Sequence, residues 1–477
     1  MSQQSPEAKV LEEPGPRRTA SPWSAGLVAS LSGATLLVGL LGFLQKLPCQ
    51  NARFDFVRTV THGCYTDIYP LYYGRELNQG KIPYFDRLAD PMGYVEYPVL
   101  SGWFMQGVAW LIRPFGADDG GLAFYLVTVL ILALLAVPAV LATVYTAGRH
   151  GRRAGLMVAL SPGLLLAAYI NWDLLAVALT ALALAAWSRR RPALAGALLG
   201  LAIAAKFYPV VLLGPFLLLC VRAGQWRALG RLLGGTAATW LLINLPVMLF
   251  AWTGWGRFYE FSKERGVDWG SVFFYLMNHG MPSVADVDRL NLIGQGSFAL
   301  LCLLIAVLAL AAPRRPRLPQ LLFLVLAAFM LTNKVWSPQY VLWLLPLAVL
   351  ARPKLPAFLV WQAGEVIYFF GIWWYLLSVT QQVDGADLGT TLSALRSFDV
   401  PDDGISVDVY HLALFARFLT VLLLVTLVVV DILRPAGDLV RADGTDDPAG
   451  GVLDEAPDRW SLGRLRARRP RPAAVTG

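Results

Sequence analysis

Charged residues are scarce in this sequence of 477 residues. Only 15% are Asp, Glu, Lys or Arg, whereas 56% are hydrophobic, and the mean hydropathy is +0.55. A soluble protein of this length carries more charge. Long apolar runs recur instead at short intervals, and such runs cross membranes as helices. The composition therefore excludes an ordinary soluble domain and predicts an all-α polytopic membrane protein.

Lysine is rare, with seven residues among the 40 basic ones, and the net charge is +8. A basic protein can bind nucleic acid. Here, however, most basic residues are arginines in short loops beside apolar runs. This distribution is typical of the cytoplasmic loops of membrane proteins. We therefore predict membrane lipids as partners and no nucleic acid.

Cysteine is rare as well, with four residues. Cys220 and Cys302 lie inside apolar runs, and we expect them to be packing residues. Cys49 and Cys64 share one loop. If that loop faces an oxidising exterior, a disulfide between them is possible. The sequence leaves the bridged and the free forms equally open.

Arginine placement predicts how the chain crosses the membrane. Apolar stretches occupy 24–46, 98–113, 121–147, 154–170, 172–188, 192–205, 208–222, 232–252, 295–312, 318–332, 338–351, 355–380 and 410–433. Arginine clusters, which favour the cytoplasmic side, lie near 17–18, 149–153, 189–191, 222–231, 314–317 and 352–354 and in the C-terminal tail. All clusters fall on one side if every stretch except 98–113 crosses.

The stretch 98–113 is also too short to cross. A helix of this length rises about 24 Å, less than the hydrocarbon core of about 30 Å, so we expect it to lie in the interface of the first outer loop. The prediction is a transmembrane domain over 23–433 with about 12 spans. Its outer loops are 47–120, 253–294 and 381–409. Residues 1–22 and the basic tail 434–477 are expected to be disordered and cytoplasmic.

This topology places isolated polar residues on the outer face of the membrane. They are Asp67, Glu96, Asp173, Lys206, Tyr208, Arg265, His279, Lys334, Gln339 and Tyr340. Ionisable groups at the edge of a bilayer are costly unless they face a polar cavity or extend to water. Simpler roles stay open: a lysine that extends to water, a solvated loop acid, or Asp173 as a helix N-cap shared with Asn171.

Two lysines near a carboxylate suit a reaction with a lipid phosphate. The first outer loop offers six acids that could serve as the general base, and Lys206 and Lys334 would stabilise the phosphate leaving group. The six are Asp55, Asp67, Glu76, Asp86, Asp90 and Glu96. Tyr208, Gln339 and Tyr340 would donate hydrogen bonds to it. Asp173 would orient a sugar hydroxyl or a lysine. A cofactor is not required, although a divalent cation at Asp173 stays open; His279, Arg265 and Glu96 are minor candidates.

The blocks that contain these residues resemble glycosyltransferase family 87. They read TDIYPLYYGREL, GKIPY, EYPVL, NWDLLAVAL, LAIAAKFYPVVLLGP and NKVWSPQYVLWLLPL. The family comprises membrane enzymes of the mannosyltransferase type with the GT-C fold, including the mycobacterial type that elongates phosphatidylinositol mannosides. The resemblance implies inverting transfer of a sugar, usually mannose, from a polyprenyl-phosphate donor to a lipid or envelope glycan acceptor on the outer face. It also implies a catalytic carboxylate soon after the first span, which is Asp67 here, and juxtamembrane helices in the first outer loop.

Two other functions fit a polytopic membrane protein. A lipid or sugar transporter (a flippase) usually has charges near the midplane and often has internal repeats. No repeat is evident here, and the predicted polar residues lie at the outer edge. A non-catalytic partner of cell-envelope enzymes would not need an acid and two lysines together. The sugar, the acceptor, the linkage and the role of the third outer loop remain open.

Overall fold

The computed structural model describes residues 24–116, 119–384, 404–442, 444, 446–454 and 456–460, without the side chains of 282 and 381–384. Every regular element in these residues is a helix, which confirms the all-α class. Six helices are long and apolar enough to cross a membrane. They are α1 (Ala25–Gln45), α6 (Gly120–Thr146), α12 (Trp226–Phe250), α15 (Val287–Ala311), α18 (Leu355–Asp384) and α20 (Val407–Leu433). The protein is therefore a multi-pass membrane protein.

Five shorter apolar helices accompany these six. They are α9 (Asp173–Ser188), α10 (Pro192–Ala205), α11 (Leu213–Ala223) after the 3-10 turn η4 (Tyr208–Leu212), α16 (Leu318–Thr332), and α17 (Val341–Ala351) after the 3-10 turn η6 (Pro338–Tyr340). The stretch 154–170 is not one helix but two, α7 (Gly151–Ala159) and α8 (Pro162–Ala167). Pro162 has no N–H to continue α7, and Ser161 caps α8 by accepting a hydrogen bond from Leu164 N. The count of about 12 spans stays a prediction.

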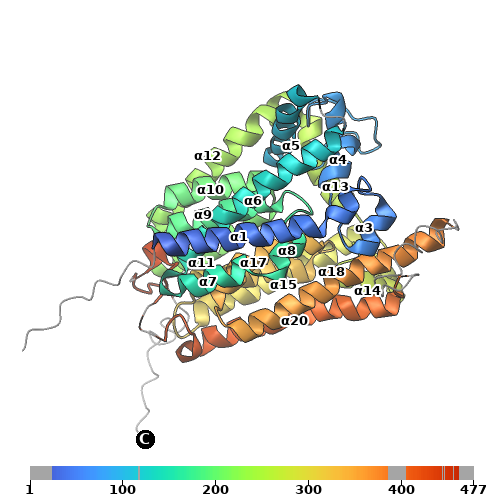
Figure 1. Cartoon of the computed structure of the whole chain (residues 1–477). Coiled ribbons are helices and arrows are strands. Elements are labelled where there is room, and N and C mark those ends of the chain that lie inside the picture. Colours follow the sequence, from blue (N-terminus) through green and yellow to red (C-terminus); the bar gives the residue numbers. More distant parts are fainter. Residues whose placement is uncertain are drawn as a thin grey trace, which may run out of the picture.

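The elements of the predicted outer loops gather at one end of the helical bundle (Figure 1). These are α3 (Phe56–His62), α4 (Ile68–Gly74), α5 (Val99–Ile112), α13 (Trp252–Glu264) and α14 (Val272–Asn278). We call this the loop end. The loops with clustered arginines lie at the other end, here called the arginine end. The two groups of loops are thus separated as the arginine pattern predicts, while the side of the membrane that each end faces stays a prediction.

Helices α10 and α12 approach each other closely because glycines line their contact. A Cβ atom added at Gly196 would overlap the carbonyl of Leu232, and one at Gly200 would overlap Thr239 Oγ1. Small residues four positions apart let two helix backbones come together in a membrane. This packing fixes the C-terminal end of α10, after which Lys206 follows.

The C-terminal tail differs from its prediction. Its described residues, which lie between 434 and 460, pack against the arginine end. Arg317 Nε lies 2.7 Å from Asp438 Oδ2, and Arg222 Nη2 lies 2.7 Å from Asp458 Oδ2. Disorder is therefore wrong for this part of the tail. Its composition is polar, but its aspartates find buried arginine partners, which composition alone does not reveal. Residues 1–22, the rest of the tail and most of the third outer loop lie outside the described residues.

Candidate active site

Asp67 immediately precedes α4 at the loop end. An aspartate at this position usually caps its helix with its side chain, but the carboxylate of Asp67 makes no such bond. Its Oδ1 accepts a 2.6 Å hydrogen bond from the Tyr65 hydroxyl, and its Oδ2 accepts one of 2.8 Å from Asn171 Nδ2. The carboxylate therefore faces other polar side chains instead of its own helix.

The segment that carries Asp67 is held against the turn between α8 and α9. The Asp67 backbone N–H donates to the carbonyl of Ile170 at 2.7 Å, and Thr66 Oγ1 donates to the carbonyl of Tyr169 at 2.7 Å. Both bonds join segments about 100 positions apart in the chain. The place of Asp67 is thus fixed by the backbone and by Thr66, independently of its own carboxylate.

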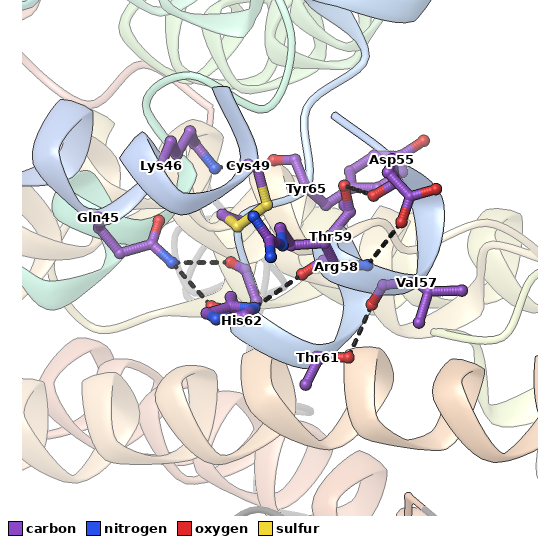
Figure 2. The surroundings of a disulfide bond; sticks show 12 residues. Gln45, Lys46, Cys49, Asp55, Val57, Arg58, Thr59, Thr61, His62 and Tyr65 are labelled. Carbon is purple, nitrogen blue, oxygen red and sulfur yellow. Dashed lines mark hydrogen bonds between the residues drawn. A yellow bond between two sulfur atoms is a disulfide. The ribbon is translucent and has the colours of Figure 1, made fainter. Parts of the chain in front are cut away.

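The same segment is also joined to the end of the first span. A disulfide links Cys49 and Cys64, with the two Cα atoms 6.1 Å apart. Gln45 Nε2 donates to the carbonyl of Gly63, and Figure 2 shows the Gln45 side chain directed toward the neighbouring His62. Lys46 Nζ donates to the carbonyl of Tyr65 at 2.7 Å. Three contacts therefore restrain the chain just before Asp67.

Lys206 pairs with Asp173 and is linked to Asp67 through Asn171. Its Nζ is 3.5 Å from Asp173 Oδ2 and donates a 3.2 Å hydrogen bond to Asn171 Oδ1. Asp173 is fully buried, and its Oδ1 accepts a 2.6 Å bond from Trp343 Nε1. The Asp173 side chain thus pairs with Lys206 and Trp343, so N-capping is not its role in this structure.

The surroundings of Asp67 make it a stronger base than an ordinary aspartate. Burial raises the pKa of Asp67, and the hydrogen bonds from Tyr65 and Asn171 and the charge of Lys206 act in the opposite direction. A carboxyl with a raised pKa accepts a proton more readily at neutral pH. Burial also lowers the pKa of Lys46 to about 7, although the charge of Asp67 opposes this.

Lys334 belongs to a second polar cluster beside the first. Its Nζ donates to the carbonyl of Lys263 at 3.0 Å, and its own carbonyl accepts a 2.9 Å bond from Asp268 N. Arg265 Nη2 lies 2.7 Å from Asp268 Oδ2. Burial, and after it the charge of Arg265, lowers the pKa of Lys334.

Arg265 also acts on Tyr65, the hydrogen-bond partner of Asp67. The charge of Asp67 and, after it, burial raise the pKa of Tyr65, and the charge of Arg265 opposes this rise. Two charged groups influence each other in this way when they are near one another. The structure therefore brings a minor candidate of the sequence close to the site and gives Lys334 a cationic neighbour.

Other predicted residues have different surroundings. Glu96 forms a two-bond ion pair with Arg75, at 2.6 and 2.7 Å. His279 Nδ1 lies 2.9 Å from the carbonyl of Tyr275, and its ring is next to that of His411. These contacts give Glu96 a structural partner and place His279 in a separate aromatic group.

The predicted hydrogen-bond donors of the 206–209 and 333–340 turns are mainly buried. The rings of Tyr208 and Tyr340 stack with Trp343, with centroids 4.4 and 3.6 Å apart. The Tyr208 hydroxyl lies 3.3 Å from Thr180 Oγ1, inside the bundle. Gln339 is buried as well. These positions suit packing around Trp343, which itself orients Asp173.

Sequence reasoning missed several residues of the site. Tyr65, Tyr97 and Trp343 were not singled out among many aromatic residues, and Lys46 looked like the end of an apolar run. Asn171 was considered only as part of a helix cap. The local signal for Tyr65 is its position two residues before Asp67, the candidate base.

The described residues contain no group of three or more His, Cys, Asp and Glu suited to a metal ion. Asp173, at which the sequence allows a divalent cation, has its two carboxylate oxygens directed to Trp343 and Lys206. A cation there would have to displace Lys206.

The fold and this site define a multi-pass helical membrane protein with a carboxylate and a lysine paired at one end of the bundle. Residues 94–338, more than half of the chain, match the model of glycosyltransferase family 87. The protein therefore belongs to glycosyltransferase family 87 and is a membrane glycosyltransferase. The matched residues include Asn171, Asp173, Lys206 and Lys334, whereas Asp67 precedes them.

The chain also has a distant similarity to a solved structure. The chain is similar to the crystal structure of the oligosaccharyltransferase from Archaeoglobus fulgidus in the apo form, with 14% identity and a TM-score of 0.33. The similarity covers 92% of this chain and 53% of the archaeal one, so the chain spans about half the length of that protein. A comparison with curated proteins found no match.

Proposed function

We propose that this protein transfers a sugar, mannose in the first instance, from a polyprenyl-phosphate donor to a lipid or envelope glycan acceptor. The reaction inverts the anomeric carbon and takes place on the outer face of the cell membrane, within a GT-C type fold. The observation that carries the proposal is the half-buried carboxylate of Asp67, which lies beside Lys206 and is not used to cap its helix.

Asp67 acts as the general base in this proposal. It takes the proton of an acceptor hydroxyl while the hydroxyl oxygen forms a bond to the anomeric carbon. The bond between that carbon and the phosphate oxygen breaks on the opposite face, and polyprenyl phosphate leaves with the electron pair. The transition state resembles an oxocarbenium ion, as in glycoside hydrolysis. The raised pKa of Asp67 suits a base that operates near neutral pH.

Cations stabilise the charge that grows on the leaving phosphate. Lys206 is partly exposed, with 15% of its side chain accessible, and is held by Asp173 and Asn171. Lys334 and Arg265 supply positive charge from the neighbouring cluster. A phosphate neutralised in this way is a good leaving group, so the proposal needs no metal ion or other cofactor.

The disulfide supports the orientation of the protein. Disulfides persist in oxidising compartments outside the cytosol, and the bridge between Cys49 and Cys64 lies at the loop end next to Asp67. An outer position of the loop end places the arginine end and both termini in the cytoplasm, in agreement with the distribution of arginine.

Transfer by the purified protein tests the proposal. The protein is reconstituted in lipid nanodiscs with radiolabelled polyprenyl-phosphate mannose and a panel of lipid acceptors, and the products are separated by thin-layer chromatography. We expect product from the native protein and none from Asp67→Asn, which keeps the shape of the side chain but loses its basicity. Matched binding of the donor by both proteins is the control for folding.

The outcomes distinguish the candidate functions. Full turnover by Asp67→Asn contradicts the role of this residue as the base. Movement of the donor lipid across vesicles without product would instead indicate a flippase. If neither product nor movement occurs with any donor, the protein would be an assembly partner. Polyprenyl-phosphate glucose and galactose as alternative donors test the choice of mannose.

A further inference from the structure

The side chain of Asn171 forms four hydrogen bonds in the site. It is 2% exposed and lies in the turn between α8 and α9. Its Nδ2 donates to Asp67 Oδ2 and to the Tyr97 hydroxyl, each at 2.8 Å. Its Oδ1 accepts from Lys206 Nζ at 3.2 Å and from Trp172 N at 2.7 Å. An amide group has two donor hydrogens and one acceptor oxygen, so every polar atom of Asn171 is engaged.

These contacts determine which way the amide faces. The nitrogen must face the carboxylate and the oxygen must face the ammonium group, because the reverse orientation would place two acceptors together and two donors together. One planar group therefore sets the spacing between Asp67 and Lys206. Aspartate or leucine would occupy nearly the same volume, but neither has the two N–H donors.

We propose that Asn171 is a positioning residue for the transfer reaction. It holds the Asp67 carboxylate in the orientation of the base and couples it to Lys206, so that the groups serving the acceptor and the leaving phosphate move as one unit. This inference rests on the proposed function, because it assigns to Asn171 an effect that is exerted through Asp67.

The loop geometry allows this role to be separated from folding. The Asp67 segment is anchored on the same turn by Asp67 N to the Ile170 carbonyl and by Thr66 Oγ1 to the Tyr169 carbonyl. Neither bond involves the Asn171 side chain. Removal of the amide therefore leaves these two anchors of the segment in place. It frees Asp67 Oδ2, while Oδ1 keeps its bond from Tyr65, and it also releases the Tyr97 hydroxyl, Lys206 Nζ and Trp172 N.

The groups that act on Asp67 come from several elements. They are Tyr65 before α4, Glu96 and Tyr97 before α5, Lys46 after α1, Asp173 at the start of α9 and Lys206 after α10. The hydrogen bond from Asn171 favours the charged form of the carboxylate. Its loss must raise the pKa of Asp67, and the acidic limb of the activity profile must then move to higher pH.

The test is the pH dependence of kcat for mannosyl transfer by the full-length protein in nanodiscs. For Asn171→Leu we expect kcat to fall at least about tenfold at neutral pH, and the acidic limb to rise by about one to two pH units, as for the loss of a hydrogen bond to a charged group. Asn171→Asp keeps the contacts to Lys206 and Trp172 N. We expect its acidic limb to rise further, because a second carboxylate then adjoins Asp67.

Two further variants serve as controls. Tyr97→Phe removes the other acceptor of the amide but not its bond to Asp67, and we expect a smaller shift in the same direction. Asn278→Leu removes an asparagine at the same end that bonds to His411 at 3.2 Å, and its acidic limb should not move.

The role of Asn171 is overturned if the acidic limb is unmoved in both Asn171→Leu and Asn171→Asp while Asp67→Asn is inactive. In that case the base assignment stands and only the positioning role fails. If Asp67→Asn is fully active, the base assignment on which the role of Asn171 depends fails, and if no donor gives product with the native protein, the proposed function itself fails. Should Asn171→Leu not fold, Asn171→Asp decides the question, since it retains the contacts to Lys206 and Trp172 N and loses the bond to Asp67.

Discussion

Arg417 of α20 offers a sharp test of how the 333–340 turn is held in place. It is 1% exposed, and its two terminal nitrogens donate to the carbonyls of Trp336 and Ser337 at 2.7 and 3.0 Å. Its Nε lies 3.0 Å from Glu365 Oε2 of α18. The guanidinium thus ties the turn that carries Lys334 to two transmembrane helices.

We predict that Arg417→Met lowers the free energy of unfolding by about 3–5 kcal/mol, the usual cost of breaking a buried ion pair by removing one partner. The two bonds to carbonyls, each worth about 1.5–3 kcal/mol for a charged donor, support a value of this size. After the change Glu365 keeps only its 2.9 Å bond from Trp361 Nε1, so its charge is left poorly compensated.

The reverse change should be milder. In Glu365→Gln, Arg417 keeps both carbonyls and the rings of Trp336 and Tyr368, whose centroids lie 4.1 and 4.2 Å from its guanidinium carbon. We expect a loss of about 1–3 kcal/mol. The double variant should be more stable than Arg417→Met alone, because it also removes the uncompensated carboxylate.

Denaturant unfolding in detergent micelles, followed by tryptophan fluorescence, measures these differences. The critical result is that Arg417→Met lowers the free energy of unfolding more than Glu365→Gln does. If Arg417→Met is as stable as the native protein, or if Glu365→Gln is the more damaging of the two, Arg417 does not hold the turn in the manner described.

Two other variants test the site and its orientation. Lys206→Met should lower the rate of sugar transfer at least about tenfold. Lys206→Arg should recover part of the rate because it restores the positive charge. Equal rates for the native protein and Lys206→Met in the nanodisc assay would contradict the role of Lys206 at the phosphate. Cys64→Ser should destabilise the protein by about 3 kcal/mol, the chain-entropy value for a loop of about 15 residues. The same loss should follow from Cys49→Ser. Thermal unfolding of the membrane-inserted protein, purified without reductant, would show no change in either variant if the bridge were not formed.

The transmembrane helices were largely predictable. The helices at 192–205 and 318–332 have the predicted bounds. Helix α1 is one residue shorter at each end than the predicted 24–46, and α18 begins at the predicted residue but extends beyond 380 to Asp384. Apolar runs bounded by arginine and proline define such helices because their backbone must satisfy its own hydrogen bonds in lipid. The interruption at Ser161 and Pro162 was missed because proline at a first helical position is compatible with an apolar run.

The contacts at the site were much less predictable. The sequence identified Asp67, Asp173 and Lys206 as isolated polar residues, but it could not show that Asn171 bonds to both Asp67 and Lys206, because the partners are 104 and 35 positions apart. It also grouped His279 and Glu96 with them, although their partners lie elsewhere. Long-range pairing depends on how the helices pack, which no local pattern reports.

By itself, the sequence of this protein determined that the chain is a bundle of membrane helices and which residues lie at which end of it. Hydropathy and arginine placement act along the chain, one loop at a time, so they can be read without coordinates. Only the tertiary structure decided which acid faces a lysine and that the described part of the tail packs against the arginine end. Those choices follow from close helix contacts, such as the one at Gly196, and from the desolvation of charges that must then find partners.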